Sequence, residues 1–353
     1  MLDYILVGSG LAGISFAETL TLQHKDFVVY DTPISCSSRV AGGIYNPVVL
    51  KRFTLVWEAE NQLQLLTPFY NTIAQRIGAQ VDFKLPMLRK LSSTEEQNNW
   101  FVAADKPGLS AFLSTSLCTN RFNGIQSPFH FGEVKHTGYV DVPLLLDHYH
   151  AYLDSKSQLV REPFVHADLY IFEDCIVYRG LKAKHIVFAE GFAMHANPWF
   201  NQLPLDGVKG ELIIIKAPAL QLDQMVNSSL FILPLGDDLY KVGATYQWDD
   251  KSTSPTEEGL QELLSKLREV IDCEFEFVDH YAGIRPTVKD RKPIIGTHAV
   301  HKRLHLLNGL GTRGVLLGPY LSQLLYDSIE HAVNLPKEIN LNRFSSKKST
   351  LSK

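Results

Sequence analysis

The sequence predicts a mixed fold, α/β and α+β, in which a domain built on a β-α-β unit is interleaved with a β-rich domain. Within the first 31 residues, two short apolar runs flank a helical stretch, and the first run ends in glycines. After about residue 81, short β-like runs outnumber helical ones and follow no fixed repeat. The chain has 353 residues, a length that suits about two domains better than one small core.

The β-α-β unit comes first. Residues 4–7 form an apolar run that ends in glycines and predict a buried strand, and residues 14–23 predict a helix. Residues 27–30 predict the next strand, which closes a unit of about 30 residues. Residues 35–43 are rich in small side chains and predict a loop.

Helical stretches follow at intervals. The first, from about residue 54 to 77, should be interrupted at Pro68. Asp141 is the expected N-cap of a later helix, with Pro143 in its first turn. The remaining helices are expected over residues 95–103, 141–154, 257–270 and 315–333.

The β-like runs do not form one alternating series with these helices. They fall near residues 171 and 176 and over 186–189, 211–216, 230–244, 275–281 and 304–307. The tail from 343 to 353 is polar and basic, and we expect it to be disordered. We assign residues 1–80, 141–205 and 285–353 to the first domain, and residues 81–140 and 206–284 to the β-rich domain.

The first turn, Gly8-Ser9-Gly10-Leu11-Ala12-Gly13, fits the pattern G-x-G-x-x-G. Gly8 permits the tight strand-to-helix turn, Gly10 lets the backbone approach a pyrophosphate, and Gly13 lets helix and strand pack closely. The start of the helix offers amides and a positive dipole to phosphates. Asp31 lies 18 residues after Gly13, and its carboxylate can accept hydrogen bonds from both ribose hydroxyls of an adenosine and would repel a 2′-phosphate. This unit predicts an adenine dinucleotide other than NADP and leaves FAD and NAD open.

Two later stretches separate these cofactors. Residues 282–296 read A-G-I-R-P-T-V-K-D-R-K-P-I-I-G, and residues 308–319 read N-G-L-G-T-R-G-V-L-L-G-P. Together with the first turn they resemble the D-amino acid oxidase family of flavoproteins, which includes glycine and sarcosine oxidases. The first stretch is similar to that family's G-x-R-P-x-x-x-D-x-x-P-x-I-G run, and the second to its terminal glycine-rich loop and helix start. Weaker similarities cover residues 37–47, 138–141, 208–211 and 242–245.

The resemblance implies a Rossmann-like FAD-binding domain with an interleaved β-rich substrate domain. It also implies oxidation of a C–N bond in a small amine or amino acid, by hydride transfer to the flavin. No cysteine follows Cys273, so FAD should be non-covalent, without the covalent link of sarcosine oxidases. The glycine-rich loop would aim the positive end of the last helix at the charge of a reduced flavin. An ordinary glycine-rich loop is the alternative.

The residues expected to contact the cofactor come from several parts of the chain. The first unit provides Gly8, Gly10, Leu11, Ala12, Gly13 and Asp31. The loop after the second strand, which is otherwise a plain loop, provides Ser37, Ser38, Arg39, Ala41, Gly42 and Gly43, whose mostly small side chains allow close backbone approach. The resemblance adds Val165, through backbone contacts to adenine, and Gly191, Gly309, Gly311, Thr312, Arg313, Gly314 and Val315.

Arg285 is the first candidate for binding a substrate carboxylate. A guanidinium offers a planar fork of donors that pairs with a carboxylate in bidentate fashion. A structural ion pair, for example with Asp290, is the alternative. The resemblance places Arg313 at a basic position beside the flavin, and a purely structural role is again the alternative.

Two positions depart from the family. Phe231 stands where some amino-acid oxidases have a tyrosine that contacts the substrate, so the tyrosine hydroxyl is missing from this chain. Tyr246 is the preferred substitute, ahead of Tyr240 and Tyr281, and completes the catalytic candidates. Glu190 stands where relatives have a small residue, and its carboxylate could point outward, bind ribose or bind substrate.

Composition excludes other classes. The net charge is −4 and no long basic run is visible, so nucleic acid is not an expected partner. The four cysteines are far apart, and His148 and His150 face different directions on a helix, so we expect no metal site and buried reduced thiols. No signal peptide or membrane-length apolar segment is visible, which favours a cytoplasmic protein. Nothing in the sequence indicates an oligomeric state.

Three other functions stay open. One is a flavoenzyme acting on a modified tRNA base, which the net charge disfavours. Another is a non-catalytic flavin-binding protein, which the missing hydroxyl at Phe231 supports. The third is a nicotinamide dehydrogenase, which the two C-terminal stretches disfavour.

Overall fold

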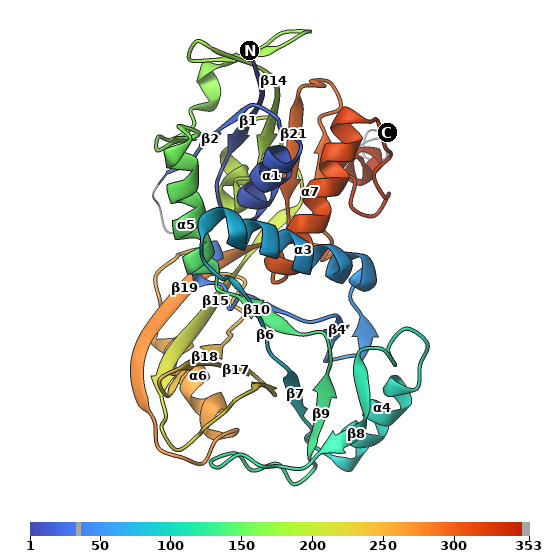
Figure 1. Cartoon of the computed structure of the whole chain (residues 1–353), viewed down its shortest axis with the longest axis vertical. Helices are drawn as coiled ribbons and strands as arrows, with labels where there is room; N and C mark the ends of the chain where they lie inside the picture. The colour runs from blue at the N-terminus through green and yellow to red at the C-terminus, as the bar shows by residue number, and fades with distance from the viewer. Residues whose placement is uncertain (33–36, 348–353) are drawn as a thin grey trace.

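The computed structural model describes residues 1–32 and 37–347. Two eight-stranded sheets lie one above the other in Figure 1, and helix α3 (Ala59–Ile77) runs between them. None of the described helices is long and apolar enough to span a bilayer.

The upper sheet is built around β1 (Leu2–Val7), which pairs in parallel with β2 on one side and β14 on the other. The residues of β2 and the last four of β1 are buried, as expected for parallel strands covered on both faces. The order is β11 (Leu159–Val160), β2 (Phe27–Tyr30), β1, β14 (Leu181–Phe188), β13 (Ile176–Tyr178) and β12 (Leu169–Ile171), with β21 (Leu304–Asn308) beside β14 and β20 (Ile294–Thr297) beside β21.

Helices cover one face of this sheet around a shared apolar core. Helix α1 (Leu11–Leu22) packs against α7 (Gly314–Glu330), and α3 also contacts α7. Helix α5 (Val142–Ser155) begins at the predicted cap, where the side chain of Asp141 accepts a hydrogen bond from the amide of Leu144 at 3.1 Å. The short helices of the described residues are α2 (Ser37–Val40), η1 (His166–Asp168), η2 (Gly191–Ala196) and η3 (Leu341–Lys347).

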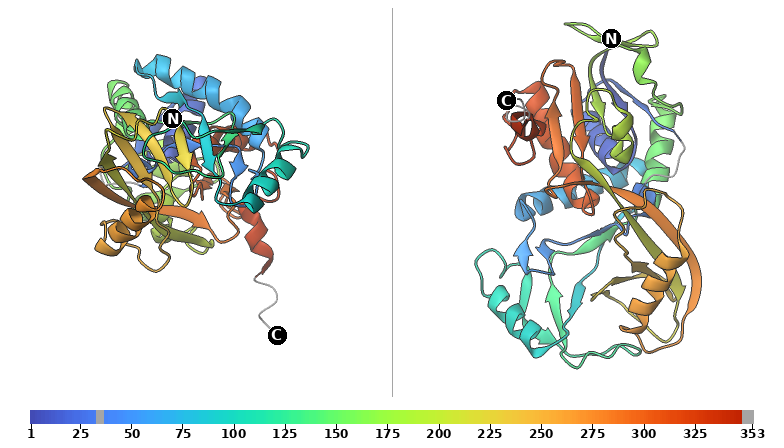
Figure 2. Two further views of the ribbon diagram at one scale, coloured as in Figure 1. Left: turned by 90° about the horizontal axis from the view of Figure 1, so that it is seen from below. Right: turned by 180° about the vertical axis from the view of Figure 1, so that it is seen from behind.

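The lower sheet is mainly antiparallel. Its order is β19 (Glu276–Val288), β15 (Leu205–Lys216), β18 (Leu239–Gly243), β17 (Phe231–Gly236), β16 (Met225–Asn227), β7 (Met87–Lys90), β9 (Phe131–Val134) and β8 (Leu113–Cys118). Helix α6 (Glu257–Arg268) lies on β15 and β18 (Figure 2), and α4 (Thr94–Ala104) lies on β8. Smaller pieces are β3 (Ile44–Tyr45), β10 (Gly138–Val140) and β6 (Asp82–Lys84) in one sheet, and β4 (Val48–Val49) with β5 (Thr54–Leu55) in another.

The two long strands β15 and β19 connect the layers. They pair along their length, from Leu205 opposite Val288 to Lys216 opposite Glu276, and β19 also contacts α2 and η2 beside the upper sheet. Strands of the upper sheet come from three separated stretches of sequence and strands of the lower sheet from two, which confirms the interleaved arrangement. The predicted boundaries near residues 205 and 284 fall on these long strands, and the assignment of residues to domains stays a prediction.

Three local expectations are corrected. Helix α3 begins at Ala59, after the small strand β5, and continues through Pro68, because Leu66, Tyr70 and Ile73 bury its apolar face. The expected loop over 35–43 contains the helical turn α2, while its residues 35 and 36 lie outside the described part. The expected disorder of the tail is wrong as far as residue 347, since η3 forms there and Arg343 bonds Asp290; residues 348–353 lie outside the described part.

Candidate active site

A cavity of about 890 Å³ lies where the two sheets meet. Its volume is within the range of roughly 300–1,000 Å³ that is usual for ligand and cofactor sites. The carboxyl ends of four upper-sheet strands reach it, through Val7, Asp31, Ala189 and Asn308. Ligands of open α/β sheets bind at this edge. The lower sheet provides the opposite wall.

The glycine turn shapes one end of the cavity. Gly8 has φ +95°, in the left-handed region that favours glycine. A Cβ at Gly13 would collide with the carbonyl oxygen of Gly8, whereas a Cβ at Gly10 would lie 3.0 Å from the Ser38 Oγ. The amide of Leu11 donates to this Ser38 oxygen at 3.1 Å. Gly10 lines the cavity without a side chain of its own, as the close approach of a dinucleotide pyrophosphate requires.

Asp31 is held in place by its neighbours. The Ser9 hydroxyl donates to its carboxylate, and the Thr32 amide donates to its Oδ1 at 2.9 Å. The Nε2 of His150 lies 2.6 Å from the Ser9 Oγ, and burial is the main cause that lowers the pKa of His150. The sequence did not indicate the roles of Ser9 and His150, because no periodicity links residues 141 positions apart.

Glu190 lines the cavity and faces inward. Its Oε1 lies 2.9 Å from the Nε2 of His166, and its Oε2 accepts a hydrogen bond from Asn197 at 2.7 Å. Only 8% of its side chain is exposed. The outward orientation that the sequence left open is therefore excluded.

Arg285, on β19, lines the cavity without the ion pair considered from the sequence. Its Nη1 donates to the carbonyl of Thr245 at 3.1 Å, and its guanidinium lies 4.6 Å from the centre of the Tyr246 ring. Asp290 pairs instead with Arg343, at 3.0 Å between Oδ2 and Nε, so the Arg285–Asp290 ion pair is wrong. Burial lowers the pKa of the Arg285 guanidinium.

Arg313 lines the same cavity at the start of α7. Its Nη1 lies 3.5 Å from the carbonyl oxygen of Asn46, and burial lowers the pKa of this guanidinium too. Among the described residues, neither Arg313 nor Arg285 has a carboxylate within ion-pair distance. Buried charges are normally paired because of their desolvation cost. Both arginines are partly buried, and two such cations on one cavity point to an anionic ligand.

Apolar side chains form another part of the cavity wall. The Phe231 ring packs between two glycines: its Cζ would lie 2.9 Å from a Cβ at Gly42 and 3.0 Å from one at Gly243. Tyr246 lies at the rim and is 62% exposed. The cavity also includes Met87 and Ile44, together with Asn227, Ser229 and Leu230, which were not predicted; these come from short strands and a loop that carry no recognisable motif.

Most of the predicted site residues are brought together. The cavity is lined by Gly8, Gly10, Leu11, Ala12, Asp31, Ser37, Ser38, Ala41, Gly42, Gly43, Gly191, Tyr246, Arg285, Gly311, Thr312, Arg313, Gly314 and Val315. Four predicted contacts do not line the cavity, namely Gly13, Arg39, Val165 and Gly309.

Each of these four has another contact. Gly13 packs on Gly8, Arg39 pairs with Asp147, the Val165 amide donates to the Tyr178 hydroxyl at 3.0 Å, and the Gly309 amide donates to Asn308 at 2.8 Å. Their direct contacts with a cofactor stay predictions.

The remaining reactive side chains do not form a metal centre within the part of the chain that is described. His298 stacks on His301, while His305 is buried in β21 against His185. Cys175 is buried, but Cys118 and Cys273 are only half-buried, which corrects the expectation of buried thiols; Cys36 lies outside the described residues.

Comparisons with known proteins agree with this architecture. The sequence profile described as FAD dependent oxidoreductase matches residues 3–328. Glycine oxidase of Bacillus subtilis is 31% identical over 165 residues, which cover 45% of this chain and 43% of that protein. The MnmC bifunctional protein of tRNA 5-methylaminomethyl-2-thiouridine biosynthesis from Marinobacter nauticus is 28% identical over 167 residues, 43% of this chain and 26% of that protein. The matches thus span less than half the length of these relatives.

A solved structure extends the likeness over nearly the whole chain. Glycine oxidase from Geobacillus kaustophilus superimposes with a TM-score of 0.77 at 20% identity, covering 96% of this chain and 98% of that one. At this identity the likeness concerns the fold, and it confirms the predicted Rossmann-like domain with an interleaved β-rich domain. Because the profile match extends from residue 3 to residue 328, the chain belongs to the family of FAD-dependent oxidoreductases.

Proposed function

We propose that the protein oxidises the C–N bond of a small amine or amino acid that carries a carboxylate. The observation that carries this proposal is the pair of partly buried guanidiniums, Arg285 and Arg313, which line one cavity and lack carboxylate partners among the described residues. A substrate carboxylate would supply the missing negative charge. Charge-assisted and bidentate hydrogen bonds of this kind are among the strong ones in proteins.

FAD would lie non-covalently across the cavity. Its diphosphate would approach the backbone at Gly10, its ribose the carboxylate of Asp31, and its ring system the loop over 311–315. When bound, the flavin supplies the acceptor for the hydride that leaves the carbon of the C–N bond. The start of α7 presents backbone amides and a positive dipole end beside this loop.

The protein's own part in this reaction is binding and orientation. Arg285 and Arg313 would fix the carboxylate, and a fixed carboxylate sets which hydrogen of the neighbouring carbon faces the flavin. Phe231 and Met87 would cover the apolar part of the substrate and exclude water. Tyr246 would hold Arg285 from above through its ring.

The acidic and imidazole groups of the described wall belong to the nucleotide end of the cavity. They are Asp31, Glu190 and His166, and each has a partner there. The proposed mechanism therefore assigns no side chain as a base, and the amine would react in its neutral form. A cytoplasmic location is part of the proposal, since the free thiols of Cys118, Cys175 and Cys273 suit a reducing compartment.

Action on a modified tRNA base is the second candidate, favoured by the match to the Marinobacter relative. The two arginines favour a small carboxylate instead. The direct test is anaerobic mixing of the FAD-bound protein with D-amino acids, N-methyl amino acids and cyclic amino acids. Each should be paired with the matching amine that lacks the carboxylate.

We expect at least one amino acid to bleach the flavin absorbance while its decarboxylated partner does so much more weakly. Equal bleaching by both partners would contradict the role of the arginines. If no small amine bleaches the flavin but a methylaminomethyl-modified tRNA does, the second candidate is correct. Bleaching by neither would favour a non-catalytic flavin-binding protein.

A further inference from the structure

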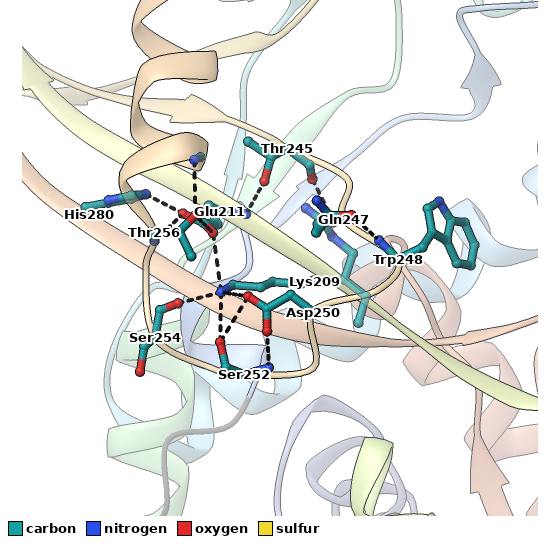
Figure 3. A network of polar contacts seen from close by, with 12 residues as sticks. Lys209, Glu211, Thr245, Gln247, Trp248, Asp250, Ser252, Ser254, Thr256 and His280 are labelled. Carbon is teal, nitrogen blue, oxygen red and sulfur yellow. Dashed lines mark hydrogen bonds and ion pairs between the residues drawn. The ribbon is translucent and has the colours of Figure 1, made fainter.

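A polar network joins strand β15 to the segment that precedes α6 (Figure 3). Its centre is Lys209 on β15, which is completely buried. The Lys209 ammonium contacts Asp250 Oδ2 at 2.6 Å, Ser252 Oγ at 3.0 Å and the carbonyl of Ser254 at 2.6 Å. Its distance to Glu211 Oε1 is 3.5 Å. The buried cation is thus surrounded by oxygens from the segment that precedes α6.

Glu211, two residues further along β15, points to the same side of the sheet. Its Oε2 accepts a hydrogen bond from the amide of Thr256 at 3.0 Å, and its Oε1 accepts one from the Thr256 hydroxyl at 2.8 Å. The Nε2 of His280 lies 2.8 Å from Oε2, within ion-pair distance. Thr256 is also the N-cap of α6, so Glu211 fixes the place where the segment ends.

The backbone of β15 holds the beginning of the same segment. Lys209 and Gln247 exchange backbone hydrogen bonds at 2.8 and 2.9 Å, and the amide of Glu211 donates to Thr245 Oγ1 at 2.9 Å. The segment from 245 to 256 is thus attached to β15 at both ends. Apolar packing contributes little to it, because Tyr246 is 62% exposed and Trp248 is 46% exposed.

This segment provides the contacts that orient Arg285. The carbonyl of Thr245 accepts from Arg285, and the ring of Tyr246 lies against the guanidinium. On the other side, the guanidinium occupies the space that a Cβ at Gly210 would fill. Gly210 lies between Lys209 and Glu211 on β15, so one short stretch of strand both supports the arginine and anchors the segment that covers it.

We propose that Lys209 and Glu211 are positioning residues, which hold Thr245 and Tyr246 so that Arg285 faces the substrate carboxylate. The inference rests on the proposed function, because it assigns a task to Arg285. A buried ion pair that only stabilised the fold would also account for the bonds of Lys209. It would not make the affinity for a carboxylate depend on them.

The test compares four variants of the FAD-bound protein, of which Lys209→Arg keeps the positive charge. Lys209→Met removes the ammonium and keeps much of the chain length. Asp250→Asn weakens the same network from its more exposed side, with Asp250 34% exposed, and serves if the first variant fails to fold. Lys216→Met is the matched control, since Lys216 is the exposed last residue of the same strand.

Two measurements are made on each variant. Hydrogen exchange followed by mass spectrometry reports the opening of residues 245–256, and titration with benzoate, followed through the flavin spectrum, reports carboxylate affinity. In Lys209→Met or Asp250→Asn we expect faster exchange over this segment and benzoate binding weaker by about tenfold or more. The dissociation constant of FAD should be unchanged, and Lys209→Arg should restore part of the benzoate affinity.

The results distinguish failure of the positioning role of Lys209 and Glu211 from failure of the proposed function. If wild-type protein binds benzoate and both network variants bind it equally well, the inference is overturned while the proposed function stands. Faster exchange without weaker benzoate binding overturns it too, because the network would then be only structural. If wild-type protein binds no carboxylate, the proposed function fails and the inference fails with it.

Discussion

Replacing Arg285 by methionine separates a ligand-binding arginine from a structural one. Hydrogen bonds to charged groups contribute about 1.5–3 kcal/mol each, and every 1.4 kcal/mol changes an affinity tenfold. Loss of the Arg285 guanidinium should therefore weaken binding of a carboxylate substrate by about 10- to 140-fold. The affinity for FAD should not change, because the predicted nucleotide contacts lie on other elements.

The effect of Arg285→Met on folding should be small or favourable. The variant loses a cation–π contact with Tyr246, worth about 0.5–2 kcal/mol, and a hydrogen bond to the Thr245 carbonyl, worth about 1.5–3 kcal/mol. It also loses the desolvation cost of a partly buried cation without a carboxylate partner, which amounts to about 2–4 kcal/mol. These contributions nearly cancel, so we expect the free energy of unfolding to change by less than about 1 kcal/mol.

Urea unfolding and anaerobic flavin reduction together provide the assay. Arg343→Met is the matched control, since Arg343 pairs with Asp290 away from the cavity. It should lower the free energy of unfolding slightly and leave substrate binding unchanged. A drop of about 3 kcal/mol in Arg285→Met, with unchanged affinity for the carboxylate, would refute the reasoning and make Arg285 a structural residue.

Two further predictions concern the upper layer. Gly13→Ala should abolish folding, because the new Cβ would collide with the Gly8 carbonyl, whereas the Cβ of Gly10→Ala would lie 3.0 Å from a serine oxygen, so this variant should fold but bind FAD weakly. Circular dichroism reports the folding of each variant, and flavin fluorescence reports its FAD affinity. If Gly10→Ala binds FAD as tightly as the wild-type protein, the predicted phosphate contact at Gly10 is wrong. Burial lowers the pKa of His185 to about 4 and that of His305 well below its usual value. The unfolded chain takes up protons near pH 6.5, so stability is retained above that pH and falls toward pH 4 by up to about 1.4 kcal/mol per pH unit for each ring. The urea midpoint of the wild-type protein should therefore be lower at pH 5.5 than at pH 7.5, and this pH dependence should be weaker in His185→Gln. Identical wild-type midpoints at the two pH values would refute the prediction.

Local sequence signals predicted the upper layer well. The glycine turn and the continuous apolar runs of residues 4–7 and 27–30 act within a few residues of one another, and β1 and β2 formed where they were expected. Pro68 was misleading, because tertiary packing of Leu66, Tyr70 and Ile73 outweighs the lost backbone hydrogen bond of one proline. Boundaries failed where long-range contacts decide them, as in η3, which is held by Arg343 and Asp290.

The candidate site was predictable where it rests on motifs and not where it rests on pairing between distant strands. Arg285 and Arg313 lie within stretches that resemble family motifs, and both line the cavity. Met87 and Asn227 reach it because β7 pairs with β16, with Met87 opposite Met225 and Asn227 opposite Arg89. That pairing joins residues about 140 positions apart and leaves no local pattern that could reveal it.

The register of β15 and β19 decides whether the two layers can share one site. Val208 lies opposite Arg285, and Gly210 lies opposite Gly283, so the guanidinium lies over Gly210, which has no Cβ to obstruct it. A shift by one residue would turn Arg285 to the other face of the sheet, away from Arg313 on α7. The polar attachments of Lys209 and Glu211 lie on the same stretch of β15, and they hold the segment whose Thr245 carbonyl bonds Arg285. The strand that joins the layers therefore also carries the information that brings Arg285 into the same cavity as Arg313, as the proposed binding of a carboxylate requires.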